Sequence, residues 1–464
     1  MEMPLPAIAR LTLTRRHNSD DSRPDRSENC AIRRLIPLVV ALALIAPSCP
    51  RDYGPGDYDP DATQTFTPSA DVEDVVYVSA NSPKGDSDYV VAMPRRETVA
   101  RIDGPDRRGW VFASATLAYY PMMRHGPDST NTIHRIDLRT GSRARIVTDG
   151  RLGLPLFDEG GPGFTALALT ADKGGLVVAR VISAGPRVWV GRYDAASGNL
   201  ETERSWPIAA IAANVQLAVA GNDFVVVTSA LLDSGRVVQE MRFLDSSLRE
   251  LTALSESDQP PGERCSAALR PFEGGRWATV CSSQEGRYAS VLILDGSYQM
   301  ASRVAVKLDV RERVVAWAAQ GGSVGMLTDR ARHVRVGVDG GLASSWLGQP
   351  DGRTILRIAR EIAPEVVAVQ FNVIAEGEPI GDIAILDVST GRVLARAASA
   401  DTAIDFVGAG DRLYVLLAGV GGSAPRLQRL DRETLAPVGI AATLPQRDEV
   451  GVSGLIALAT LRAD

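Results

Sequence analysis

The sequence of 464 residues contains few of the residue types that mark several large classes of protein. Lysine occurs only at Lys84, Lys173 and Lys307, so arginine supplies nearly all of the positive charge. The arginines are scattered along the chain, the formal net charge is −6, and the isoelectric point is near 5.5. A nucleic-acid-binding surface needs a concentrated basic patch. The composition therefore argues against nucleic acid as a partner.

Histidine is also scarce, with four residues that do not form a metal-binding or catalytic pattern. A metal site needs His, Cys or carboxylate groups that converge, and the spacing of His125, His134 and His333 does not indicate such a cluster. No nucleophile elbow, phosphate-binding loop or dinucleotide fingerprint occurs in a fitting context. The sequence thus predicts no catalytic residue, metal or cofactor, with an enzyme kept as an open alternative.

Long hydrophobic runs are missing apart from 12 residues at Leu35–Ala46. A membrane-spanning helix needs about 20 residues, whereas a run of this length after Arg33 and Arg34 suits a signal peptide. Cys49 follows small residues, which resembles the site where bacterial lipoproteins are lipidated and cleaved. We expect residues 1–48 to be a signal peptide with a long N-terminal region and Cys49 to carry a lipid. Secretion without a lipid and a buried core segment are the alternatives.

Residues 49–71 are rich in Pro, Gly and Asp and poor in apolar side chains. Such a composition buries too little surface to fold alone, so it predicts a flexible tether. The folded domain would then occupy residues 72–464. We expect it on the outer side of a bacterial membrane, held through Cys49, or free in the periplasm or outside the cell.

The sequence does contain a short turn signature that recurs through this domain. Most copies begin with an aspartate after an apolar run, at Asp137, Asp194, Asp245, Asp295, Asp339, Asp387 and Asp431, and a degenerate copy lies at Pro94. Successive copies are 43 to 57 residues apart. A period of about 40–50 residues is typical of a β-propeller.

The chemistry of the signature predicts a hairpin. An aspartate can accept a hydrogen bond from the backbone two residues on, and a glycine at the far end can adopt positive φ, as at Gly141, Gly198 and Gly391. A second hairpin precedes most copies, as in VQLAVAGNDFVVVTSAL. Two hairpins per period give four strands per blade. We therefore expect an all-β propeller with eight blades, or seven as the alternative.

The two ends of the domain predict how the ring closes. The first blade has three recognisable strands, at Val75–Ala80, Asp88–Pro94 and Glu97–Asp103, where four are needed. The last strand, Ser453–Arg462, has no partner within its own repeat. We expect this strand to complete the first blade as its innermost strand, which hides exposed strand edges.

Four-stranded units at this period resemble the quinoprotein-like (PQQ-like) β-propeller repeats, including those of exported bacterial lipoproteins in outer-membrane assembly. The resemblance covers roughly residues 72–464 and rests on turn residues such as Asp137, Thr140 and Gly141. In enzymes of that superfamily a tryptophan follows the turn and docks neighbouring blades. No repeat of this chain keeps that tryptophan, and Ile146 stands near its place in the first full copy. The resemblance implies the fold and export, without the cofactor.

Cys265 and Cys281 lie symmetrically about Glu273 in the turn Pro271–Gly275. Facing positions in an antiparallel pair have Cα atoms about 4.5–5.5 Å apart, close to disulfide geometry. An exported protein also meets oxidising conditions. We expect a disulfide across this hairpin, with two buried free thiols as the alternative.

Propellers bind ligands through loops on a scaffold, and no catalytic set is visible in this sequence. We therefore expect a non-catalytic binding or scaffold module that takes a protein, peptide or glycan on the propeller face. One alternative is a propeller enzyme, such as a lyase, hydrolase or quinoprotein relative, with its site at the mouth of the central channel. The other is a structural part of a cell-envelope assembly.

Overall fold

The computed structural model describes the chain between residues 65 and 461, except for short gaps. The described ranges are 65–82, 85–103, 110–122, 132–147, 165–182, 186–210, 212–255, 263–283, 286–347, 354–373, 381–399, 401–419, 424–444 and 451–461. The predicted signal peptide, Cys49 and the predicted tether up to residue 64 lie outside these ranges. No helix within them is long and apolar enough to cross a membrane.

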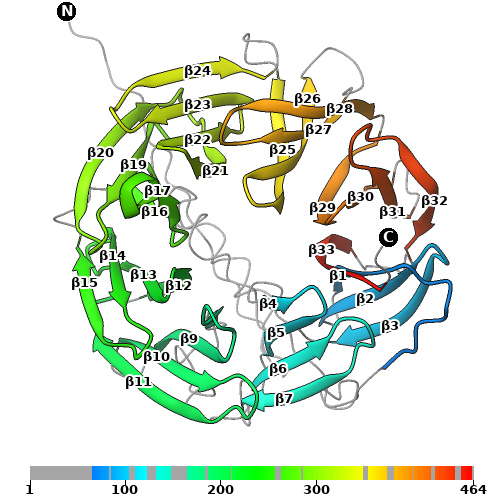
Figure 1. Ribbon diagram of the computed structural model, residues 1–464, viewed down its shortest axis with the longest axis horizontal. Coiled ribbons are helices and arrows are strands. Elements are labelled where there is room, and N and C mark those ends of the chain that lie inside the picture. The colour runs from blue at the N-terminus through cyan, green and yellow to red at the C-terminus, as the bar shows by residue number, and fades with distance from the viewer. Residues whose placement is uncertain are drawn as a thin grey trace, which may run out of the picture. The chain divides into compact units, whose positions relative to one another are not determined.

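Antiparallel sheets follow one another around a ring, with the blades in chain order (Figure 1). Blade 1 contains, from the centre outward, β33 (Gly451–Thr460), β1 (Asp74–Ser82), β2 (Gly85–Met93) and β3 (Glu97–Asp103). Blade 2 contains β4 (Val111–Ser114), β5 (Leu117–Met122), β6 (Thr132–Asp137) and β7 (Arg143–Val147). Blade 3 contains β8 (Thr165–Leu169), β9 (Gly175–Ile182), β10 (Arg187–Asp194) and β11 (Leu200–Pro207). Blade 4 contains β12 (Ala212–Ala220), β13 (Asp223–Leu231), β14 (Val237–Leu244) and β15 (Glu250–Leu254).

In blade 5 the innermost position is shared by two short strands. These are β16 (Glu263–Cys265) and β17 (Arg270–Phe272), followed by the 3-10 turn η4 (Glu273–Gly275), β18 (Arg276–Ser283), β19 (Tyr288–Leu294) and β20 (Met300–Lys307). Blade 6 contains β21 (Val314–Gln320), β22 (Ser323–Thr328), β23 (Arg332–Gly337) and β24 (Leu342–Trp346). Blade 7 contains β25 (Thr354–Ala363), β26 (Val366–Val373), β27 (Gly381–Asp387) and β28 (Arg392–Ser399). Blade 8 contains β29 (Ala403–Ala409), β30 (Arg412–Leu417), β31 (Arg426–Asp431) and β32 (Pro437–Thr443).

This strand order confirms the predicted all-β propeller with eight four-stranded blades, and the seven-bladed alternative is wrong. The core is divided into eight apolar clusters, one between each pair of neighbouring blades. Successive side chains of a strand point to opposite faces of its sheet, so each blade contributes to two clusters. The second strands β9, β22 and β30 are buried at every position. The outermost strand β24 is exposed at every position.

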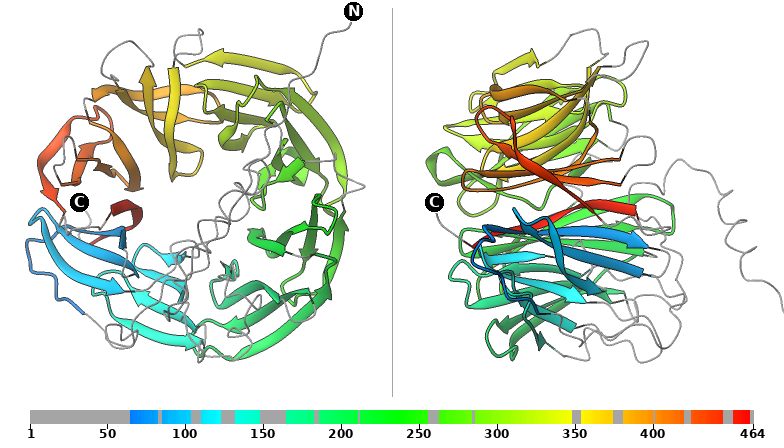
Figure 2. Two further views of the ribbon diagram at one scale, coloured as in Figure 1. Left: turned by 180° about the vertical axis from the view of Figure 1, so that it is seen from behind. Right: turned by 90° about the vertical axis from the view of Figure 1, so that its right-hand side faces the viewer.

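The ring closes as the sequence predicts, because β33 pairs antiparallel with β1. Figures 1 and 2 show the C-terminal strand, in red, beside the blue strands of blade 1. Leu455 and Leu458 of β33 pack against blade 8, and Ala457 and Ala459 pack against blade 2. An ion pair also crosses this seam, where the buried Arg412 of blade 8 lies 2.9 Å from a carboxylate oxygen of the partly exposed Glu73 in the segment just before β1.

The predicted turns all join the third and fourth strands of a blade. In six copies the aspartate accepts a hydrogen bond from the N–H two residues on, and Asp194 accepts one from the third residue, Ser197. Gly198 has φ of 73°, and a Cβ there would lie 1.8 Å from the carbonyl oxygen of Ile146. Ile146, near the place of the missing tryptophan, therefore lies against the turn of the next blade.

The chain already contacts the propeller at Phe66, within the segment 49–71 whose composition predicts a tether. Phe66 is buried in the cluster between blades 1 and 2. Its N–H donates a hydrogen bond to the carbonyl oxygen of Thr140. Asp71, further along, forms an ion pair with Arg95 at 2.6 Å.

Candidate functional site

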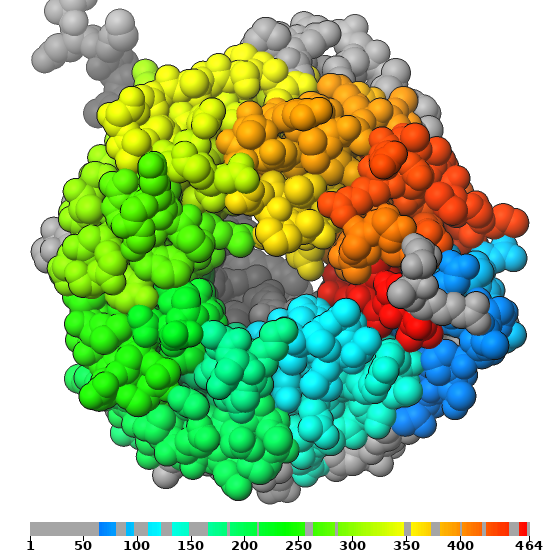
Figure 3. All heavy atoms as spheres, in the orientation of Figure 1, coloured from blue at the N-terminus to red at the C-terminus, as the bar shows by residue number. Residues whose placement is uncertain are grey.

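The centre of the ring is hollowed (Figure 3). A pocket of about 410 Å³ lies against the innermost strands of blades 4, 5 and 6. It is lined by Gln216, Arg264, Cys265, Ser266, Val280, Ser282, Val314, Val315, Ala316 and Trp317. Most of these residues lie where β16 and β21 begin and where β18 ends. The pocket therefore opens where the chain enters each blade, at the mouth of the central channel.

One wall comes from the face of blade 5 that looks toward blade 6. Arg264 pairs directly with Ser282 across β16 and β18, so their side chains share a face of the sheet. Val280 lies two residues from Ser282 along β18 and belongs to the cluster between blades 5 and 6. This wall therefore combines the guanidinium of Arg264 and the hydroxyl of Ser282 with the apolar side chain of Val280.

The opposite wall comes from the first residues of β21. The register with β22 shifts between Val314 and Ala316, so Val315 is the extra residue of a β-bulge. Bulges re-aim side chains and are frequent beside binding sites. Val315 is 40% exposed, and the indole of Trp317 is half-buried against the cluster between blades 5 and 6. The result is an apolar wall on the blade 6 side of the pocket.

Arg264 is the one charged side chain among the described residues that line the pocket. Its Nε is buried without a hydrogen-bond partner, and within the described ranges no ion pair reaches its guanidinium. Burial lowers the pKa of Arg264, but a guanidinium stays protonated in proteins. Arg264 is therefore a half-buried guanidinium that has no counter-charge among the described residues and can attract an anion.

Nearby carboxylates do not neutralise this arginine, because each has another cation. Glu263 accepts hydrogen bonds from Arg303 at 2.7 Å and from Ser290 at 2.7 Å. Glu312, just before β21, binds Arg332 through both carboxylate oxygens at 2.9 and 2.7 Å. In the part of the chain that the structure describes, the positive charge of Arg264 therefore remains without a counter-charge.

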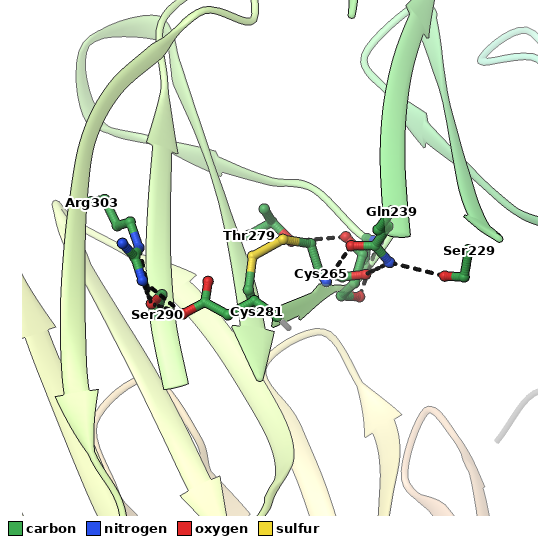
Figure 4. The surroundings of a disulfide bond; sticks show 10 residues. Ser229, Gln239, Cys265, Thr279, Cys281, Ser290 and Arg303 are labelled. Atoms are coloured by element: carbon green, nitrogen blue, oxygen red, sulfur yellow. Dashed lines mark hydrogen bonds and ion pairs between the residues drawn. A yellow bond between two sulfur atoms is a disulfide. The ribbon is translucent and has the colours of Figure 1, made fainter. Parts of the chain in front are cut away.

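The predicted disulfide between Cys265 and Cys281 is present beside the pocket (Figure 4). The two residues face each other in the register of β16 and β18, as their symmetric spacing predicts. Their Cα atoms are 3.7 Å apart, closer than the expected 4.5–5.5 Å of facing positions. The hairpin is also not continuous, because β16 and β17 are separated by residues 266–269.

A glutamine from the neighbouring blade also holds β16 in place. Gln239 of β14 accepts a hydrogen bond from the N–H of Cys265 at 2.6 Å and donates one to its carbonyl oxygen at 3.1 Å. Figure 4 shows this amide lying against Cys265, with Ser229 beyond it. Arg264 is thus presented by a three-residue strand that is fixed from two sides.

An ion pair and a hydrogen bond link innermost strands elsewhere around the channel. Arg270 of β17 contacts both carboxylate oxygens of Glu361 in β25 at 2.8 and 2.9 Å, which connects blades 5 and 7. Asp405 of β29 accepts a hydrogen bond from the N–H of Leu455 in β33 at 2.9 Å. These contacts connect neighbouring parts of the channel wall. The charges of Arg270 and Glu361 are paired with each other and are not left for a ligand.

The two histidines within the described ranges, His134 and His333, do not line the pocket. His134 is buried and contacts the hydroxyl of Thr132 at 2.9 Å. His333 lies 2.8 Å from the carbonyl oxygen of Val388, and burial lowers its pKa. Within the described ranges, no group of three or more His, Cys, Asp or Glu residues could hold a metal ion. Cys49, the predicted lipidation site, lies outside those ranges.

Sequence reasoning identified Cys265 but missed Arg264, Trp317 and Gln216. One signal was available for Arg264, because successive side chains of a strand point to opposite faces of the sheet. The residue next to Cys265 must therefore lie on the face opposite the disulfide. The missing partner of Arg264 depends on how blades 5 and 6 meet, which the sequence does not display.

The sequence matches no protein-family model and none of the curated proteins compared with it. The resemblance to quinoprotein-like repeats therefore stays at the level of the turn signature. Similar solved structures include BamB from Moraxella catarrhalis, with a TM-score of 0.38, 10% identity, and coverage of 80% of this chain and 91% of that one. Sqt1 from Saccharomyces cerevisiae has a TM-score of 0.43 and 11% identity, with coverage of 73% and 88%.

A prolyl endopeptidase is also similar, with a TM-score of 0.44 and 14% identity over 74% of this chain and 48% of that one. This chain thus spans about half the length of that enzyme. None of these similarities assigns an activity or a partner. The chain is an eight-bladed β-propeller by the order of its own strands.

Proposed function

We propose that the protein is a non-catalytic binding module whose ligand enters the pocket between blades 4, 5 and 6. The observation that carries this proposal is the combination of an apolar wall at Val315 and Trp317 with an unpaired cation at Arg264. Ligand sites are commonly concave and mostly apolar, with a few polar groups that fix orientation. This pocket places the apolar side chains of Val315 and Trp317 opposite the polar groups of Arg264 and Ser282.

The experiment compares two substitutions of exposed valines in blade 6. Val315→Trp fills the pocket, while Val338→Trp places the same side chain on an outer turn; the two valines are 40% and 48% exposed. A library of small metabolites, peptides and oligosaccharides is screened by the shift in melting temperature that each compound causes. We expect compounds that stabilise the parent and Val338→Trp but not Val315→Trp, and that are recovered chemically unchanged.

Two results would contradict the proposal. One is a set of ligands that stabilise all three proteins equally, which would place binding elsewhere. The other is conversion of the bound compounds into products during incubation, seen by mass spectrometry, which would favour an enzyme.

We also propose that the module is exported and anchored through a lipid on Cys49. The basic pair before the apolar run and the position of Cys49 after small residues support this. A disulfide is typical of an oxidising compartment. Mass spectrometry of membrane fractions should find a mature protein that begins at a diacylglycerol-modified Cys49. A chain that retains residues 1–48 in the cytoplasm would contradict export, and a soluble unmodified Cys49 would contradict only the lipid.

A further inference from the structure

We propose that the pocket recognises a carboxylate, bound by Arg264, whose adjoining apolar group lies against Val315 and Trp317. This inference rests on the proposed function and specifies the chemical class of its ligand. It is carried by the charge, the donors and the walls of the pocket.

The charge of the pocket defines the charge of the ligand. Among the described residues that line it, Arg264 is the only ionisable side chain, since the disulfide removes Cys265 from titration. Glu263 and Glu312 are committed to Arg303 and Arg332. A monoanion would balance the single guanidinium, whereas a phosphate dianion would bring a second charge that has no counterpart among the lining residues.

The donors around Arg264 suit a planar oxyanion. A guanidinium presents N–H groups in a fork that matches a carboxylate in a bidentate contact. Ser282 lies directly opposite Arg264 in the register, and its hydroxyl has no partner within the described ranges. The hydroxyl oxygen of Ser266 accepts a hydrogen bond from the N–H of Ala268 at 3.1 Å, which leaves its proton available for donation. The described lining residues include no carboxylate that would repel the anion.

The volume of the pocket and its apolar wall on blade 6 limit which group can be attached to the carboxylate. A volume of about 410 Å³ is near the lower end of the 300–1,000 Å³ typical of ligand pockets. The side chains of Val280, Val314, Val315 and Trp317 offer an apolar surface, and the amide of Gln216 adds a single polar group from blade 4. A small hydrophobic acid and the C-terminal residue of a peptide share this chemistry.

The test uses acids matched with their primary amides, so that only the carboxylate differs. The probes are 3-phenylpropionate, N-acetyl-phenylalanine and the peptide acetyl-Gly-Gly-Ala-Phe, each titrated calorimetrically beside its amide. We expect at least one acid to bind at least tenfold more tightly than its amide. Binding by the two small acids indicates a free acid as the ligand, and binding by the peptide alone indicates a chain end.

Arg264→Gln should bring each acid to parity with its amide, and Arg264→Lys should restore part of the preference. The matched control is Arg313→Gln, because Arg313 is exposed next to β21 and does not line the pocket. All three variants should melt within a few degrees of the parent.

The inference is overturned if no acid is preferred over its amide, or if Arg264→Gln keeps the preference. Amides that bind as tightly as acids, and lose binding in Val315→Trp, would overturn the carboxylate while leaving the proposed binding function standing. If the panel does not bind at all, the carboxylate inference fails. The proposed function then stands or falls on the library screen.

Discussion

At the scale of single residues, the outer turns show how directly local chemistry determines structure. Each aspartate of the signature accepts hydrogen bonds from the backbone of its own turn, so these contacts involve only about five consecutive residues. That is why the turns, their spacing and the glycines with positive φ could be predicted from the sequence. The turn residues also carry charge, which makes their contribution depend on pH.

Asp245 provides a test of that dependence. Burial alone would raise the pKa of its carboxyl, but hydrogen bonds from Ser247 and Arg249 lower it to about 2. The pKa of an unfolded aspartate is about 3.9. The lowered value therefore stabilises the folded protein above about pH 4, and this stabilisation is lost as the pH falls toward 2.

We expect Asp245→Asn to be less stable than the parent at pH 7 and to approach it near pH 2.5, measured by urea denaturation. Asparagine keeps an acceptor oxygen but does not ionise. Asp233→Asn, at an exposed position in the loop between β13 and β14, is the control and should change little at either pH. A deficit for Asp245→Asn that stays constant across this range would refute the pKa argument.

Arg264 shows the limit of residue-level prediction. Its identity is plain in the sequence, but its importance comes from having no counter-charge among the described residues. That property depends on where Glu263 and Glu312 find their partners, which are 40 and 20 residues away. Only the packed blades determine such pairings.

At the scale of elements, the divided inner strand of blade 5 is the most unusual feature. A three-residue strand has few ladder hydrogen bonds of its own, so β16 depends on the disulfide to β18 and on Gln239. The symmetric spacing of the cysteines predicted the bond, but not the interruption at residues 266–269. That interruption has no turn signature in the sequence.

Replacing both cysteines with alanine should lower the free energy of unfolding by about 3 kcal/mol. This is the stabilisation that loop-closure entropy predicts for a disulfide-closed loop of this length. The propeller should still fold, because Gln239 continues to hold the backbone of residue 265. Denaturation of the parent and of the Cys265→Ala, Cys281→Ala variant under oxidising conditions measures the difference. Equal midpoints, or two thiols that react with an alkylating agent in the native oxidised parent, would show that the bond is absent.

At the scale of the whole molecule, eight similar blades must be closed into a ring. The count of eight could be predicted from the period of the turn signature. The joining of both ends in blade 1 could be predicted because the first blade lacks one strand and the last strand lacks a partner in its own repeat. The position of the pocket could not be predicted in this way. The blades repeat the same turn chemistry, and the innermost strands of blades 6, 7 and 8 all contain bulges. The break after Cys265 is what sets the innermost strand of blade 5 apart from these.

Closure can be tested with two deletions of similar length. Removing residues 453–464 exposes the clusters on both sides of blade 1, including the surface that Leu455 and Leu458 cover. This variant should aggregate or lose its cooperative thermal transition. Removing residues 50–64, which precede the buried Phe66, should leave the transition nearly unchanged. The closure account is wrong if the C-terminal deletion melts like the parent while the other deletion does not.

The most direct measurement of the central claim, that ligands bind at the channel mouth, uses two tryptophans of one blade. Trp317 lines the pocket on the innermost strand, and Trp346 lies 36% exposed on the outermost strand. The protein is labelled with 5-fluorotryptophan, and Trp317→Phe and Trp346→Phe assign the two fluorine resonances. Each compound that stabilises the parent should shift the Trp317 resonance in a saturable way and leave that of Trp346 in place. Saturable shifts at Trp346 with an unchanged Trp317 resonance would contradict the account.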